Sequence, residues 1–141
     1  MSTRLSKAEY ELLAAFRHAL RQFLHFSEAA AHAVGIEPQQ HQALLAIKGY
    51  RGRDRVIISE LAEQLQIKHH SAVGLADRLV ANGLVVRASD SRDRRQVYLA
   101  LTPHGNELLE QLSTAHKEEL WRLGPELRAL LARLDETGSE R

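Results

Sequence analysis

At 141 residues, with 44% hydrophobic and 26% charged side chains, the chain is long enough for one globular domain with a sizeable core and an oligomer interface. No stretch approaches the roughly 18 apolar residues of a membrane span, and the N-terminus lacks the apolar core of a signal peptide. We therefore expect a cytoplasmic protein without a membrane partner. The absence of cysteine excludes disulfides and zinc sites built on thiolates.

Charge is unevenly distributed along the chain, although the net charge is only +1. From Lys48 to Arg95 ten basic residues stand against six acidic ones, a balance of +4, whereas the remainder carries −3. A basic middle segment is typical of a protein that binds a polyanion such as nucleic acid. Random clustering of surface charge is the alternative. The sequence motifs are needed to distinguish these two interpretations.

Two helices are predicted in the first third of the chain. Ser6 and Glu9 form a capping box, and apolar residues follow at helical spacing until Gly35. A helix of roughly 28 residues would be about 42 Å long, which is more than a globule of this size needs. Pro38 suits the first turn of a second helix, which is expected over 39–48.

A possible strand, two short helices and a hairpin are predicted in the middle of the chain. Residues 56–58 are β-branched and favour an edge strand, after which Ser59 is predicted to cap a helix over 60–65. Another helix is expected over 69–82. Strands over 84–87 and 96–101 then predict a hairpin with a strongly charged tip.

The last third is predicted to be helical. Thr102 and Pro103 favour the start of a long helix that reaches about Leu123. Gly124 and Pro125 are expected to break it, leaving a last helix over 126–134. The predicted fold class is therefore mainly α with a small β-hairpin (α+β).

Two short helices joined by a tight turn and followed directly by a hairpin are typical of a winged helix-turn-helix. The second short helix fits the major groove of DNA, which is roughly 12 Å wide, and its first residues reach base edges. Arginines at the tip of the hairpin, or wing, can enter the narrow minor groove beside it. The helix pair alone is a weak signal, but together with the wing it becomes a specific one.

In these elements the chain resembles the MarR (multiple-antibiotic-resistance regulator) family over about residues 38–110. The residues that carry the resemblance are Ile58–Ala62, Asp77–Leu79, Asn82–Val85, Arg87, the wing tip at 90–95, Val97, Leu99, Leu101–Pro103 and Gly105. The helices on either side agree with the family in length and order only.

The resemblance implies one domain over 1–141, in which a winged helix-turn-helix at 38–102 is flanked by dimerisation helices at 1–37 and 103–141. It further implies a homodimer that binds near-palindromic double-stranded DNA as a transcriptional regulator, expected to be a repressor that responds to a small aromatic or phenolic effector. The leucines of the final helices support a dimer independently, because they offer more apolar surface than a small winged domain covers. The alternative is that these helices fold back on their own subunit.

The second short helix supplies the candidate base-reading residues. Where members of the family often have a polar pair such as Thr-Arg, this chain has Val73 and Gly74, which shifts base reading toward His69, His70 and Ser71 and lets Val73 touch a thymine methyl. Gly74 inside a helix costs about 1 kcal/mol relative to alanine, so close approach to DNA or a close helix crossing has to explain it. The recognition-helix candidates are Lys68, His69, His70, Ser71, Val73, Gly74 and Arg78.

The wing and one loop supply the candidate backbone contacts. The resemblance assigns minor-groove insertion to Arg95 or Arg94, with Asp93 holding the tip, and makes Arg87 and Arg92 backbone contacts or structural partners. A merely solvated hairpin tip is the alternative. Further candidate phosphate contacts are Arg51, Arg53, Arg55 and Ser59.

The histidines and acids do not form a recognisable catalytic or metal motif. His18, His25 and His32 recur every seven residues, about 10.5 Å apart along a helix, so they cannot share one zinc ion. We expect structural or surface roles, and no metal or cofactor. In the alternative suggested by the resemblance, His25 and His32 line an effector pocket between the dimer helices and the winged domain.

No phosphate loop or nucleophile motif indicates an enzyme. The competing function is an architectural or accessory DNA-binding protein without effector response.

Overall fold

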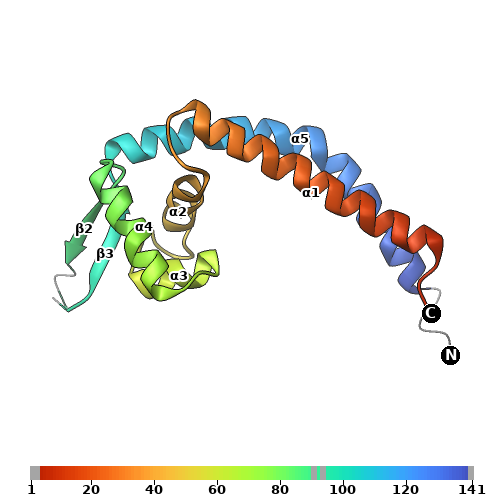
Figure 1. Cartoon of the computed structure of the whole chain (residues 1–141), viewed down its shortest axis with the longest axis horizontal. Coiled ribbons are helices and arrows are strands. Elements are labelled where there is room, and N and C mark those ends of the chain that lie inside the picture. Colours follow the sequence, from red (N-terminus) through yellow and green to blue (C-terminus); the bar gives the residue numbers. More distant parts are fainter. Residues whose placement is uncertain (1–3, 90–91, 93–94, 140–141) are drawn as a thin grey trace. The chain divides into compact units, whose positions relative to one another are not determined.

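The computed structural model describes residues 4–89, 92 and 95–139, and its helices and strands follow the order expected for a winged helix fold (Figure 1). The elements are α1 (Lys7–Ala33), α2 (Pro38–Lys48), β1 (Arg55–Val56), α3 (Ile58–Leu65), α4 (His69–Ala81), β2 (Val85–Ser89), β3 (Val97–Leu101) and α5 (Pro103–Ser139). The described residues divide into two compact units. Unit 1 contains residues 4–30 and 114–139, and unit 2 contains Ala31–Ser113.

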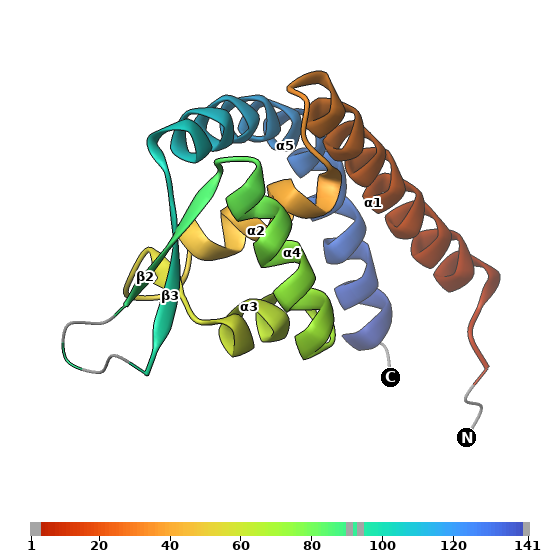
Figure 2. The same cartoon turned by 60° about the vertical axis from the view of Figure 1, so that its left-hand side comes forward.

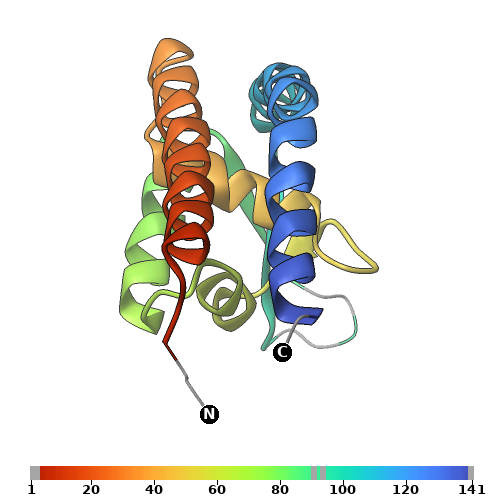
Figure 3. The ribbon, with the colours of Figure 1, turned by 90° about the vertical axis from the view of Figure 1, so that its right-hand side faces the viewer.

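Unit 1 consists of the first part of α1 and the later part of α5, which run alongside each other (Figures 1 and 3). The predicted capping box is confirmed, since the Ser6 and Glu9 side chains each accept a hydrogen bond from the other residue's backbone N–H at 3.2 Å. The two helices meet at His116, whose Nε2 lies 2.8 Å from the buried Ser27 hydroxyl. Phe23 and Phe26 pack edge-on against the His116 ring.

The predicted break at Gly124 and Pro125 is wrong, because α5 is continuous from Pro103 to Ser139. Pro125 removes only one backbone donor, the partner of the Trp121 carbonyl one turn earlier. On either side of it Leu123 and Leu130 are buried, and because they are seven positions apart they lie on one helix face. The common buried face favours one continuous helix despite the cost of the proline.

Unit 2 packs α2, α3 and α4 around one core, with the hairpin at its side (Figure 2). The sheet has the order β1-β3-β2, and both neighbouring pairs are antiparallel. The largest fully buried side chains are Leu44, Ile47, Val56, Leu61, Leu75, Leu79, Leu84, Val85 and Leu99. They come from all three helices and all three strands, so the hairpin is an integral part of this core.

Two predicted boundaries before the hairpin are corrected by the structure. The strand is Arg55–Val56 rather than 56–58, and α3 begins at Ile58 rather than after a Ser59 cap. The reason is Glu60, whose carboxylate accepts a hydrogen bond from the Ile57 backbone N–H at 2.9 Å and so starts the helix one turn before Leu61. Ser59 is an exposed residue within the first turn.

The hairpin pairs Val85 with Leu101 at its base and Ser89 with Val97 near its tip. Its strands are close to the predicted ones, with β2 reaching two residues further toward the tip. None of the helices in the described part of the chain has an apolar stretch long and uncharged enough to cross a bilayer.

Candidate nucleic-acid interface

Helix α4 has one buried and one exposed face. Its buried residues, at the three- and four-residue spacing of a helix, are Ala72, Leu75, Ala76 and Leu79. The opposite face presents the exposed residues Lys68, His69, His70, Val73, Asp77 and Arg78, with Ser71 and Gly74 half-buried beside them. The structure therefore brings the seven predicted recognition residues onto the accessible side of one helix or its edge.

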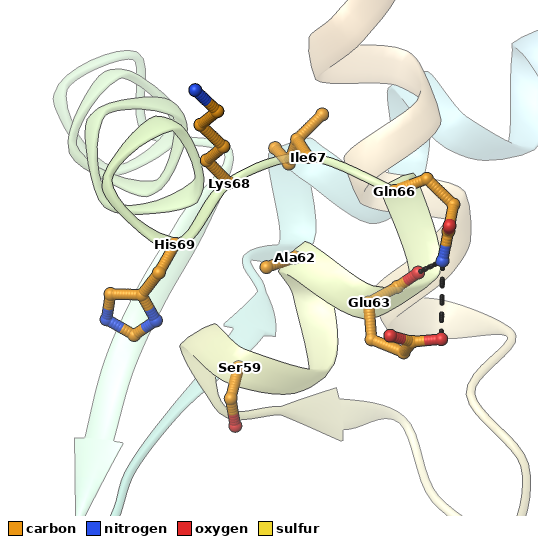
Figure 4. A pocket seen from close by; sticks show the side chains of 7 residues that line it. All are labelled: Ser59, Ala62, Glu63, Gln66, Ile67, Lys68 and His69. Carbon is orange, nitrogen blue, oxygen red and sulfur yellow. Dashed lines mark hydrogen bonds between the residues drawn. The ribbon is translucent and has the colours of Figure 1, made fainter.

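The N-terminus of α4 is open to an anion. Lys68 occupies the N-cap position in an extended conformation, and no side chain caps the helix there, as lysine has no acceptor. Figure 4 shows the adjoining open groove, which lies between α3 and the start of α4 and is bordered by Ser59, Ala62, Glu63, Gln66, Ile67, Lys68 and His69. Uncapped backbone amides, the helix dipole and a lysine together favour negative charge at this end.

The turn between α3 and α4 is held by Gln66. This residue adopts the left-handed conformation, with φ 55° and ψ 48°. Its side-chain amide donates to the Glu63 carbonyl oxygen at 2.7 Å and lies 3.3 Å from the Glu63 carboxylate (Figure 4). The turn thus fixes the direction in which α4 leaves α3.

Gly74 has no packing reason to be a glycine within the described part of the single chain. A Cβ built there would meet only the Arg78 Nη1 atom at 3.6 Å, which is an ordinary van der Waals distance at the end of a flexible side chain. A close helix crossing would instead place backbone atoms against it. The close helix crossing suggested by the sequence is therefore not found in the described part of the chain. Close approach to DNA stays a prediction, next to a Val73 that is 38% exposed.

Arg87 and Arg78 join α4 to its neighbours. Arg87 on β2 forms an ion pair with Asp77 on α4, and the Arg78 guanidinium lies 3.5 Å from the Gln39 side-chain oxygen on α2. Arg87 therefore ties the wing to the recognition helix. Because 43% of its side chain is exposed, it remains accessible to solvent.

At the wing tip, Arg92 and Arg95 are exposed in the structure. Asp93 and Arg94 lie outside the described residues, so the predicted tip ion pair and the insertion of Arg94 stay predictions. Arg95 stays a candidate for the minor groove, and Arg92 stays a candidate for a backbone contact or a structural partner.

The basic loop before β1 contains three arginines in different surroundings. Arg51 is exposed, whereas Arg55 lies with its Cζ atom 4.3 Å from the centre of the Tyr98 ring. Arg53 is partly buried, forms an ion pair with Glu60, and has its Cζ atom 4.6 Å from the centre of the Tyr50 ring. The three predicted phosphate contacts are thus not equivalent.

Glu60 and Tyr50 are residues that sequence reasoning did not single out. Burial opposes ionisation of Glu60, but hydrogen bonds from the Ile57 backbone, Tyr50 and Arg53 hold the pKa of its carboxyl below the ordinary value. The hydrogen bond to Glu60 raises the pKa of the Tyr50 hydroxyl. The signal in the sequence was the acidic residue three positions after Ile57, which is the spacing of a capping box.

The two predicted effector-pocket histidines are both exposed in the single chain. His32 lies 3.8 Å from the Glu37 carboxylate, with 60% of its side chain accessible. Among the described residues, no three histidine, cysteine or acidic side chains lie close enough to hold a metal ion.

The geometry of unit 2 defines a winged helix-turn-helix: two short packed helices with an open N-terminus on the second, followed at once by a hairpin. Residues 34–96 match the model of the MarR family. This match covers less than half of the chain, and over this segment it confirms the resemblance to the family.

Comparison with known proteins agrees with this assignment. The HTH-type transcriptional repressor MdtR of Bacillus subtilis (strain 168) is 30% identical over 83 residues, which are 59% of this chain and 52% of MdtR. The alignment thus spans about half the length of that curated relative. AbsC, a MarR family transcriptional regulator from Streptomyces coelicolor, shares the fold with a TM-score of 0.74 and 22% identity over 96% of this chain and 93% of its own.

A second solved structure is described as showing how DNA binding of Bordetella bronchiseptica BpsR is regulated by 6-hydroxynicotinic acid. It has a TM-score of 0.62 and 20% identity, and the match covers 100% of this chain and 99% of BpsR. At this level of identity the likeness concerns the fold alone.

Proposed function

We propose that this protein is a sequence-specific DNA-binding transcriptional regulator. The observation that carries the proposal is α4, a helix whose inner face is buried in unit 2 while its uncapped N-terminus and outer face are accessible. The wing beside it presents Arg92 and Arg95, and the whole segment from Lys48 to Arg95 has a charge balance of +4. Phosphate neutralisation by the wing and loop, and base discrimination by α4, are the expected chemistry.

The regulator is proposed to act as a homodimer on a near-palindromic site. Large apolar side chains of unit 1 remain exposed in the single chain: Tyr10, Leu13, Leu24, Leu120, Trp121 and Leu131. Other leucines of α5 (Leu109, Leu112, Leu123 and Leu130) are buried within the chain itself, so only part of the predicted apolar surface is left for a partner. Two recognition helices in a dimer would bind half-sites about one turn of DNA apart.

Selection of bound sequences from a random pool of duplex DNA tests this proposal. A two-fold symmetric motif with half-sites about 10 base pairs apart is expected, with affinity that falls steeply as salt rises. A monomeric protein that retains no duplex DNA, even at low ionic strength, would contradict it.

Repression relieved by a small aromatic or phenolic acid is the finer form of the proposal. The name of MdtR supports a repressor, and the ligand of BpsR, an aromatic acid, supports this class of effector. Titrating 6-hydroxynicotinic acid and related acids into the complex with the selected DNA tests it, and substitution of His25 and His32 shows whether either contributes. DNA affinity that no such acid changes would favour the architectural or accessory DNA-binding protein instead.

A further inference from the structure

One cluster of unit 2 connects the first helix of the helix-turn-helix to the wing. Arg53, from the loop before β1, forms an ion pair with Glu60 on α3, and its Cζ atom lies 5.4 Å from the centre of the Tyr98 ring on β3. The other ring against this guanidinium is that of Tyr50, at 4.6 Å. One arginine therefore contacts a helix, a loop and a wing strand at once.

Glu60 has a double function in this cluster. One carboxylate oxygen accepts the Ile57 backbone N–H that starts α3, and the other receives the Arg53 guanidinium. Only 20% of the Glu60 side chain and 30% of the Arg53 side chain are accessible to solvent. A pair shielded in this way is worth more than an exposed surface ion pair.

The wing side of the cluster is equally well fixed. Tyr98 is 9% exposed, and its hydroxyl donates to the Gln96 side chain at 3.1 Å. The adjoining residues Arg55 and Val56 pair with Ala100 and Leu99 of the same strand. A change in the position of Arg53 would therefore displace β3, the strand that leads back from the wing tip.

We propose that Arg53 and Glu60 are positioning residues that set the wing against α3, rather than contacts to DNA, an inference that rests on the DNA-binding function proposed above. To reach a phosphate, the Arg53 guanidinium would have to leave both rings and the carboxylate. The exposed Arg51 of the same loop has no such ties to the described residues and is the better phosphate contact.

Neutralising Glu60 tests whether the pair positions the wing or acts on DNA through charge alone. The two possibilities predict changes of opposite sign in DNA affinity. Glu60→Gln removes a negative charge near DNA, so electrostatics alone would tighten binding. The glutamine amide oxygen can still accept the Ile57 N–H, while the ion pair to Arg53 is lost. If the pair sets the wing, DNA binding should weaken by about tenfold, comparable to the loss of one specific arginine contact.

The matched control is Asp54→Asn, which removes one negative charge, as Glu60→Gln does, from the loop that carries Arg53. Asp54 is exposed and makes no hydrogen bond or ion pair with the described residues. This variant should bind DNA as well as the parent protein, or slightly more tightly. Both variants are measured against the DNA selected with the parent protein, with thermal unfolding recorded in parallel.

Two further variants keep the outcome decisive if Glu60→Gln folds poorly. Arg53→Lys retains the charge but loses the planar fork, so it should weaken binding as much as Arg53→Gln. The double variant Arg53→Gln, Glu60→Gln should be no weaker than either single variant, since both remove one interaction. Tighter or unchanged binding by Glu60→Gln, or parent-like binding by Arg53→Lys, would overturn the proposal. A parent protein that binds no DNA would instead refute the proposed function.

Discussion

Replacing Gly74 with alanine should stabilise the protein and weaken its binding to DNA. The added Cβ meets only the Arg78 side chain, at 3.6 Å, so the folded chain has room for it. An alanine inside a helix is favoured over glycine by about 0.8–1 kcal/mol, which for a chain of this length raises the melting temperature by roughly 3 °C.

On DNA the same methyl group stands where the recognition helix is expected to approach most closely. Inserting a methyl into a close contact costs about 1–3 kcal/mol, which corresponds to a loss of affinity of about 5-fold to 150-fold. Melting curves at one protein concentration and titrations with labelled operator DNA measure both effects on the same sample. We expect Gly74→Ala to have a higher melting temperature than the parent protein and a lower affinity for DNA.

Gly124→Ala is the matched control for binding. Gly124 also lies inside a helix, and a Cβ there would meet an arginine in the same way, 3.7 Å from Arg128 Nη1. Because it belongs to unit 1, its substitution should leave the affinity for operator DNA unchanged. If Gly74→Ala binds as tightly as the parent, Gly74 has no part in the interface. If it unfolds more easily, the space inferred around Gly74 is not there.

Three other outcomes follow from the structure. Gly105→Ala should destabilise the fold by about 1–3 kcal/mol in urea unfolding, because its Cβ would overlap the Leu84 carbonyl oxygen; a neutral effect would contradict this packing. Trp121→Ser should shift sedimentation toward monomer, since this side chain is 71% exposed in the single chain; an unchanged dimer would place the interface elsewhere. The lowered pKa of Glu60 adds stability above its ordinary carboxyl pKa of 4.5, and this is lost as pH falls through the lowered value. The difference in free energy of unfolding between the parent and Glu60→Gln should therefore decrease below pH 4.5. A difference that does not depend on pH would refute this.

Most local structure could be predicted because it depends on neighbouring residues. The capping box at Ser6, the start of α2 at Pro38 and the hairpin are encoded by residues within a few positions of each other. The candidate recognition residues could be predicted because they lie on the accessible side of a single helix or at its edge. Their accessibility agrees with the expectation, whereas their contacts to DNA stay predictions.

The errors arose where distant contacts outweigh local preference. Pro125 locally predicts a break, but the burial of Leu123 and Leu130 on one face favours a continuous α5. Arg53 has the same charge as Arg51 in the sequence, and only the fold brings it to Glu60 and Tyr98. The pairing of a two-residue strand, β1, with β3 is likewise set by the fold, more than forty residues along the chain.

The close approach at Gly105 has a mechanical consequence. The Leu84 carbonyl accepts the Thr102 backbone N–H at 3.0 Å, the Thr102 hydroxyl donates to the Gly83 carbonyl at 2.6 Å, and Gly105 leaves no space for a side chain between them. Leu84 is itself bonded to the Leu79 carbonyl in the last turn of α4. These contacts leave no room for independent movement between the end of α4 and the start of α5. A rotation of the first turn of α5 must therefore also rotate α4, the helix proposed to read the bases.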